Sequence, residues 1–138
     1  MNENELSRVI VDASVEVHRT LGGPGLLEIA YEESLAYELE LRNCEVERQQ
    51  QLPIIYKGKT LGSPLRLDLR INGIVLIDPK AVTEYNAIFE AQMLTYLRMT
   101  GLKLGLVINF GEKYLKDGIH RVVNGLKDKK SEPPNFAP

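Results

Sequence analysis

Two aspartates and a lysine stand at a spacing that suits metal-assisted hydrolysis. Asp68 and Asp78 are separated by nine residues, and Lys80 follows Asp78 with one residue between them. Mg²⁺ and Mn²⁺ take oxygen ligands and keep several waters when a protein binds them. Such an ion can bind a phosphate oxygen and lower the pKa of a water, and a lysine could orient or help to deprotonate that water. The three residues therefore indicate phosphodiester hydrolysis, provided that the fold brings them together.

The strands that carry these residues decide whether they meet. Residues 65–71 and 74–80 are strand-like and are joined at Asn72-Gly73, which is a strong hairpin signal. Successive side chains of a strand point to opposite faces of a sheet. A two-residue turn at this point would therefore place Asp68 and Asp78 on opposite faces.

A hairpin loop one residue longer gives a different result. With Gly73 as a bulge in the left-handed region, Arg70 pairs with Ile74, and all three candidate residues lie on one face. The other face then holds only apolar side chains: Leu67, Leu69, Ile71, Val75 and Ile77. Because a slip of one residue inverts a whole strand, the apolar residues should choose the register, and we predict the longer loop. From spacing alone, solvated charges on a strand face are the more common explanation of this pattern.

The rest of the chain predicts a mixed sheet with helices packed on it. Apolar periodicity indicates helices over 3–20, 26–42 and 85–99, and extended segments over 45–56 and 102–110. Residues 57–59 read as a turn, and 119–123 as a short strand or helix. A helix between two strands predicts a right-handed parallel crossover, while the hairpin supplies antiparallel pairing. The fold class is therefore α/β.

Composition limits the class of protein. The chain of 138 residues suits one domain, which we expect over residues 1–126, followed by a polar, proline-containing tail over 127–138. Cys44 is the only cysteine and there are two histidines, so a zinc site of Cys and His ligands is not expected. The N-terminus lacks a signal-peptide pattern and no stretch reaches the length of a membrane span, so we expect a cytoplasmic protein. The net charge of −2 argues against a broad basic face for nucleic acid.

Three motifs together resemble a known superfamily. The arrangement of Asp68, Asp78 and Lys80 looks like the D…(D/E)-x-K signature of the PD-(D/E)XK nucleases. Gln92 and Tyr96 resemble the Q-x-x-x-Y motif of its RecB-like branch, and residues 25–31 match G-x-x-E-x-x-Y. The stretches VEVHRTLGGPGLLE, EAQMLTYLRMTGLKLGLVINF and KDGIHRVVNGL are also similar to the small GxxExxY family of that superfamily.

This resemblance implies a fold, a site and a reaction. The fold would be a mixed four-stranded sheet flanked by helices, with a restriction-endonuclease-like core. Asp68, Asp78 and Glu28 would be ligands of Mg²⁺ or Mn²⁺, and Lys80 would be the catalytic lysine. Gln92 and Tyr96 would orient active-site groups or the nucleic-acid backbone. The implied function is a Mg²⁺-dependent nuclease acting on DNA or RNA, alone or with a homodimer partner or another protein.

Three departures from the family pattern keep other functions open. Asp78 stands where glutamate is usual, Pro79 replaces an apolar residue, and Phe89 stands where histidine is common. Proline removes a backbone donor from a strand and could turn Lys80 away from the metal. The alternative is a non-catalytic nucleic-acid-binding or regulatory module on a decayed nuclease fold, and a weaker one is a small-nucleotide hydrolase.

The other candidates also have structural explanations. Glu28 could simply complement the dipole of its helix, and Tyr31 lies on an apolar stripe typical of the core. Gln92 and Tyr96 could form a buried hydrogen-bonded pair, and a lone His18 is more often a packing residue than a ligand.

Overall fold

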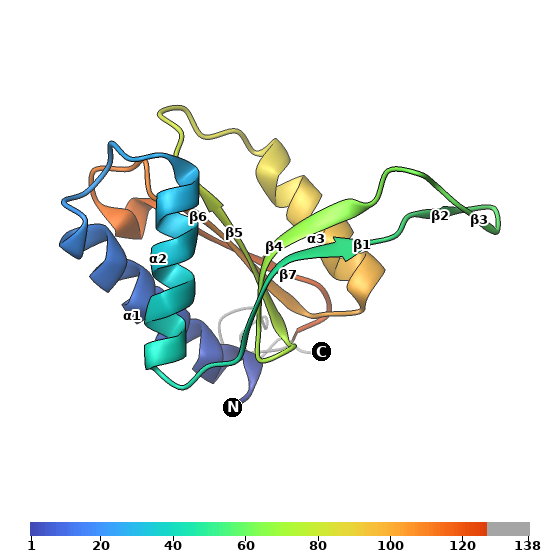
Figure 1. The fold of residues 1–138 in the computed structure, drawn as a ribbon, viewed down its shortest axis with the longest axis horizontal. Helices are drawn as coiled ribbons and strands as arrows, with labels where there is room; N and C mark the ends of the chain where they lie inside the picture. The colour runs from blue at the N-terminus through green and yellow to red at the C-terminus, as the bar shows by residue number, and fades with distance from the viewer. Residues whose placement is uncertain (127–138) are drawn as a thin grey trace, which may run out of the picture.

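A five-stranded mixed sheet with helices on both faces forms the body of the protein (Figure 1). The computed structural model describes residues 1–126, so the predicted tail over 127–138 lies outside the described residues. The helices are α1 (Glu3–Thr20), α2 (Glu28–Leu41), α3 (Ile88–Thr100) and the short 3₁₀ helix η1 (Leu115–Gly118). None of the helices within residues 1–126 combines the length and apolarity that crossing a membrane requires.

The sheet runs in the order β1-β4-β5-β6-β7, and only the pairing of β5 with β6 is parallel. Its strands are β1 (Val46–Leu52), β4 (Leu65–Ile71), β5 (Val75–Lys80), β6 (Leu104–Asn109) and β7 (Ile119–Val123). The α/β fold class and the crossover through α3 are confirmed. The expected number of four strands was wrong, because residues 119–123 pair along β6 and add a fifth strand at the edge.

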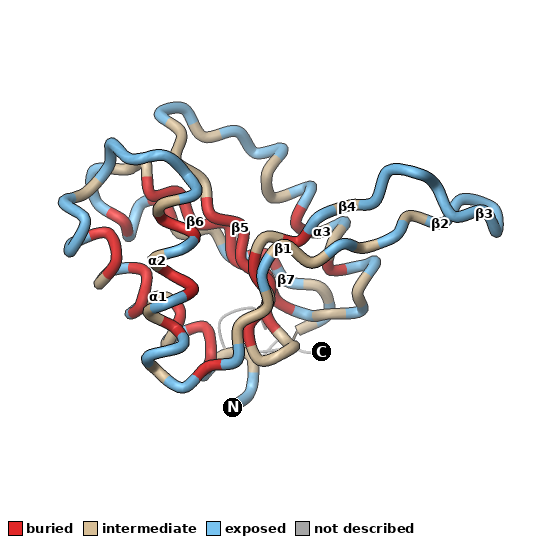
Figure 2. Tube along the Cα trace, in the orientation of Figure 1, coloured by how far each residue is buried: buried red, intermediate tan, exposed pale blue. Residues whose placement is uncertain are grey.

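The helices bury their apolar stripes on opposite faces of the sheet. On one face, α1 and α2 contribute buried side chains such as Leu6, Ile10 and Leu35 to a core with Leu69 and Ile77. On the other face, α3 contributes Met93 and Leu97 to a smaller core. Figure 2 shows the buried positions concentrated along the central strands and the inner sides of the helices. The central strand β5 is thus covered on both faces, so that Asp78 is buried and Lys80 is half-buried.

The β4–β5 hairpin has the predicted loop length but a different pairing. Ile71 lies opposite Val75 and Leu69 opposite Ile77, so the loop is Asn72-Gly73-Ile74. The predicted partner of Arg70 was wrong, because Ile74 closes the turn by donating its N–H to the carbonyl of Ile71. Arg70 lies opposite Leu76 instead. The observed pairing differs from the predicted one by two positions, so the paired residues 69–71 and 75–77 keep their predicted faces. Asp68 and Asp78 lie just beyond the ladder and line one pocket, as predicted.

The β4–β5 ladder stops before it reaches Asp68. It ends at the pair of Leu69 and Ile77, although both strands continue. On the other side of β4, the pairing with β1 skips Gln49, which has φ of 54° and lies across from Asp68. Leu67 consequently packs in the core under α3, whereas it was expected on the opposite face with Leu69. The divergence of β4 from β5 leaves a pocket between them.

A thin hairpin arm extends beyond the body of the protein. It consists of β2 (Ile55–Tyr56) and β3 (Lys59–Thr60), which pair only with each other. The turn between them is Lys57-Gly58, where φ is 48° and 81°. Figures 1 and 2 show the arm projecting from the ends of β1 and β4, with every residue of its two strands exposed. The predicted extended segment over 45–56 is therefore divided between the sheet and the arm.

Candidate active site

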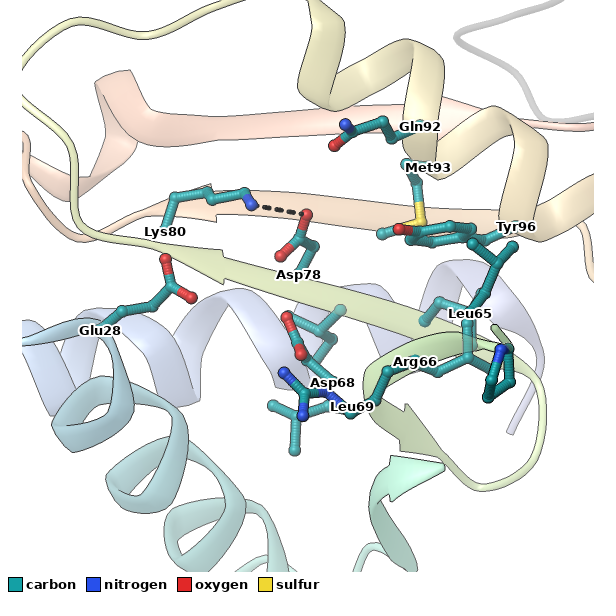
Figure 3. A pocket seen from close by; sticks show the side chains of 14 residues that line it. Glu28, Leu65, Arg66, Asp68, Leu69, Asp78, Lys80, Gln92, Met93 and Tyr96 are labelled. Carbon is teal, nitrogen blue, oxygen red and sulfur yellow. Dashed lines mark ion pairs between the residues drawn. The ribbon is translucent and has the colours of Figure 1, made fainter. Parts of the chain in front are cut away.

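The pocket beside the diverging strands holds all six residues expected at a site. Its volume is about 350 Å³, and β4, β5, α3 and the start of α2 form its walls. The lining residues are Glu28, Pro64, Leu65, Arg66, Leu67, Asp68, Leu69, Leu76, Ile77, Asp78, Lys80, Gln92, Met93 and Tyr96. Figure 3 shows the three carboxylates, the lysine and the two α3 side chains around one space. Local patterns on four separate elements thus converge on one pocket.

Lys80 points into the pocket and not away from it. Its Nζ atom lies 3.5 Å from Oδ2 of Asp78 and 4.4 Å from the centroid of the Phe89 ring (Figure 3 shows the ion pair). A cation over an aromatic face is attracted to it. Beyond Ile77, β5 pairs with β6 and no longer with β4. The missing N–H of Pro79 therefore breaks no hydrogen bond with β4, and the proline is tolerated at this position. The concern that Pro79 turns Lys80 away from the site does not apply to this fold.

Asp78 is a buried acid with an unsatisfied oxygen. The residue is 7% exposed, and its Oδ1 atom has no hydrogen-bond partner among the described residues. Burial is the largest effect that raises the pKa of Asp78 to about 7, followed by a side-chain hydrogen bond with Asp68. The charges of Asp68 and Glu28 raise this pKa further, while Lys80 lowers it. Burial and the negative charges of Asp68 and Glu28 thus favour the protonated form of Asp78 over a wider pH range than for an exposed aspartate.

Gln49 contacts Asp68 from the side of β1 and is itself held by Glu32. Nε2 of Gln49 lies 3.5 Å from Oδ1 of Asp68 and donates to Oε2 of Glu32 at 2.7 Å. Glu32 is 3% exposed and also accepts a hydrogen bond from Arg48 at 2.9 Å. The positive φ of Gln49 accompanies this contact. Gln49 therefore links Asp68 to an ion pair between the buried Glu32 of α2 and the exposed Arg48 of β1.

Glu28 reaches the rim of the pocket from the first residue of α2. Tyr31 holds the preceding loop, since its hydroxyl donates to the carbonyl of Gly23 at 2.8 Å and accepts from the N–H of Leu26 at 3.1 Å. The Tyr31 ring is fully buried and stacks on Phe110, so its core role is confirmed. Burial of the carboxyl group raises the pKa of Glu28, and the charges of Asp68 and Glu32 add to this rise against the opposing effect of Lys80.

The α3 residues close the pocket on the other side. Gln92 is exposed and Tyr96 is half-buried, so they are not the buried pair that was one explanation of their spacing. Burial raises the pKa of Tyr96, and the charges of Asp78 and Asp68 raise it further. Figure 3 shows the Tyr96 hydroxyl directed toward the side of the pocket that holds Asp78. Both side chains can therefore contact a ligand that occupies the pocket.

The donor set fits a hard divalent cation. Asp68 and Asp78 present carboxylate oxygens to one space, and the unpartnered Oδ1 of Asp78 is a buried acceptor without a donor. Within residues 1–126, no three Asp, Glu, His or Cys side chains form a complete cluster of ligands. Mg²⁺ and Mn²⁺ keep waters and bind through one or two carboxylates together with substrate phosphate, so an incomplete protein shell suits them.

Two site residues were not singled out from the sequence. Arg66 lines the pocket, and Figure 3 shows its guanidinium near Asp68. Gln49 contacts Asp68 across the strand pair of β1 and β4. Arg66 lies two residues before Asp68, so strand alternation is a signal that groups these two side chains, whereas only the long-range register identifies Gln49. His18, by contrast, is 7% exposed and hydrogen-bonds through Nε2 to the carbonyl of Glu112 at 2.9 Å, which makes it a packing residue.

The fold and the site define a class of protein. A mixed α/β sheet with two acids and a lysine on its diverging central strands is consistent with a restriction-endonuclease-like fold. Residues 4–122 match the family model described as the PD-(D/E)XK nuclease superfamily, and the chain therefore belongs to this superfamily. Searches of curated proteins and of solved structures found no match. Nucleases of this superfamily generally use divalent metal ions.

Proposed function

We propose that the protein is a Mg²⁺- or Mn²⁺-dependent nuclease that hydrolyses phosphodiester bonds in DNA or RNA. Membership of the superfamily supports nuclease activity in general. The observation that carries the metal-dependent reaction is the buried, unpartnered Oδ1 of Asp78 in a pocket shared with Asp68 and Lys80. Buried acceptors normally have a partner, and a cation shared by the two aspartates would satisfy this oxygen.

Asp68 and Asp78 would hold the ion, with Glu28 available at the rim of the pocket. When bound, a divalent ion supplies Lewis-acid activation of the phosphate and lowers the pKa of a coordinated water. The ion pair with Asp78 and the contact with Phe89 hold Lys80 in a fixed position. From there Lys80 can orient the attacking water or neutralise charge that develops on the phosphate.

The remaining pocket residues would position the substrate. Gln92 can hydrogen-bond through both its amide oxygen and its nitrogen, and Tyr96 through its hydroxyl. Arg66 can bind a phosphate oxygen by charge-assisted hydrogen bonds. Gln92 and Tyr96 face the pocket from α3, one helical turn apart, which supports placing this chain in the RecB-like branch. The loop held by Tyr31 supports the GxxExxY assignment, since it explains the spacing of Gly25, Glu28 and Tyr31.

Cleavage assays test this function against the non-catalytic module. Labelled single-stranded and double-stranded DNA and RNA are incubated with the wild type, with Lys80→Ala and with the control Lys116→Ala, in Mn²⁺ and in EDTA. Lys116 is exposed on η1 and outside the pocket, so its loss should not change cleavage. We expect Mn²⁺-dependent cleavage that Lys80→Ala lowers by roughly a hundredfold or more. Metal-dependent binding of the same substrates without cleavage would favour the regulatory module.

A further inference from the structure

The β2–β3 arm exposes apolar side chains that make no contribution to the core. Ile55 is 64% exposed and Tyr56 is 60% exposed, and neither belongs to the buried clusters. An isolated two-stranded hairpin is marginally stable in water. The arm therefore costs conformational entropy without a matching gain in burial within the chain, which is expected of a binding element.

One face of the arm combines an aromatic ring with two ammonium groups. Tyr56 lies opposite Lys59 in the hairpin register, so their side chains share a face. Nζ of Lys57 lies 5.4 Å from the centroid of the Tyr56 ring, which places this lysine on the same face. Residues 50–66 carry Lys57, Lys59 and Arg66 and no acidic residue, although the whole chain has a net charge of −2. The arm is thus a basic feature on an acidic protein.

The chain leads directly from this face into the pocket. Residues 61–64 connect the arm to β4. Pro64 and the first two residues of β4, Leu65 and Arg66, line the pocket, and Asp68 follows two residues after Arg66. Figure 1 shows the arm continuing the line of β1 and β4 outward from the site. Positive charge therefore stands at both ends of this segment, with Lys57 and Lys59 at the tip of the arm and Arg66 in the pocket. A polyanion lying along the segment would meet both and would present its phosphates to the pocket.

We propose that the β2–β3 arm binds an unpaired polynucleotide strand next to the bond that is cleaved. Lys57 and Lys59 contact its phosphates, a base stacks on Tyr56, and Arg66 binds the phosphate that enters the pocket. Aromatic rings paired with basic groups bind single strands, because unpaired bases expose the faces that a duplex hides. That the ligand is a nucleic acid rests on the proposed function. That its strand is unpaired is inferred from the positive charge and the exposed ring of the arm.

The chain supplies a matched control for each change. Lys113 and Tyr114 form a second exposed pair, with Nζ 5.5 Å from the ring centroid and Tyr114 58% exposed. They precede η1, the orange segment at the end of the molecule opposite the arm in Figure 1. The double variant Lys57→Ala/Lys59→Ala in the arm has Lys113→Ala/Lys116→Ala as its control, because both remove two positive charges. The arm variant Tyr56→Leu has Tyr114→Leu as its control, because both remove one exposed ring.

Binding is measured by fluorescence anisotropy with labelled single-stranded and duplex oligonucleotides in EDTA, over a series of salt concentrations. We expect Lys57→Ala/Lys59→Ala to weaken single-strand binding by roughly tenfold or more and to reduce the slope of log K against log salt by about 1.4. Tyr56→Leu should weaken single-strand binding by at least about fivefold and leave duplex binding within twofold. The control variants should match the wild type in every assay.

Wild-type affinity for single strands in both arm variants would overturn the proposal, as would the absence of single-strand binding by the wild type. Equal loss of single-strand and duplex binding in Tyr56→Leu would overturn the preference for an unpaired strand. The same proteins are then tested for cleavage in Mn²⁺. If the arm variants lose single-strand binding but the wild type cleaves nothing, only the proposed nuclease function is contradicted. If the wild type cleaves and the arm variants bind single strands as well as the wild type does, only the role of the arm is contradicted.

Discussion

Replacing Asp78 with asparagine should make the metal-free protein more stable at neutral pH. The pKa of Asp78 is raised from 3.8 to about 7 by burial, by the hydrogen bond with Asp68 and by the nearby charges. Between these two values the folded state holds a proton that the unfolded state has released. The free energy of unfolding of the wild type therefore falls as the pH rises from about 4 to about 7. Above pH 7, Asp78 is ionised in both states and causes no further fall.

The size of the effect follows from the shift. One pKa unit corresponds to 1.36 kcal/mol, so a shift of about three units corresponds to an upper limit of about 4 kcal/mol. Asp78→Asn replaces the ionisable group with a neutral one of nearly the same shape and removes this loss. Without metal, its free energy of unfolding should exceed that of the wild type by on the order of 2–4 kcal/mol above pH 7, and the two should converge near pH 4.

Urea unfolding in EDTA across this pH range measures the difference directly. Asp12→Asn is the control, because Asp12 is exposed on α1. Parallel stability curves for the wild type and Asp78→Asn between pH 4 and pH 7 would refute the reasoning, since they would show that Asp78 ionises without cost in the folded protein. Mn²⁺ should raise the stability of the wild type at pH 7 and leave that of Asp78→Asn nearly unchanged.

Other side chains around the site give further predictions. Phe89→Leu should lower the cleavage rate several-fold by removing the ring beneath Lys80, whereas Phe89→Tyr keeps the ring and should retain most of the rate; equal loss in both would contradict a cation–π role. Gln49→Leu should weaken Mn²⁺ binding measured by calorimetry by roughly 10–100-fold, because it frees Asp68; unchanged binding would show that this contact is dispensable. Tyr31→Phe should lower the free energy of unfolding by about 0.5–1.5 kcal/mol in urea, since the half-buried carbonyl of Gly23 loses its donor; unchanged stability would show that this hydrogen bond does not hold the loop.

Strand alternation was sufficient to predict which face the acids occupy. The period of two along 65–71 and 74–80 predicted the parity, and the apolar residues chose between the two possibilities. The period holds for the paired residues 69–71 and 75–77, whereas Leu67 departs from it. The pairing itself was wrong by two positions, because nothing in the local pattern shows that Ile74 closes the turn. A shift of two positions keeps each side chain on its face, so the predicted grouping of Asp68 with Asp78 did not depend on it.

Long-range geometry accounts for what the sequence did not predict. The contact between Gln49 and Asp68 depends on the register of β1 against β4, which no local period encodes. The divergence of β4 from β5 moves Leu67 to the opposite core, and this divergence also creates the pocket. Helices α1 and α2 were predictable to within about two residues, since their apolar stripes and the glycines between them are local signals.

Calorimetric titration of Mn²⁺ into the wild type, Asp68→Ala and the control Asp12→Ala tests the central claim most directly. If Asp68 and Asp78 share a divalent ion, the wild type and the control should bind Mn²⁺ with equal affinity, and Asp68→Ala should lose the binding. Binding of Mn²⁺ that persists unchanged in Asp68→Ala, or no binding by the wild type, would contradict a metal centre at this pocket.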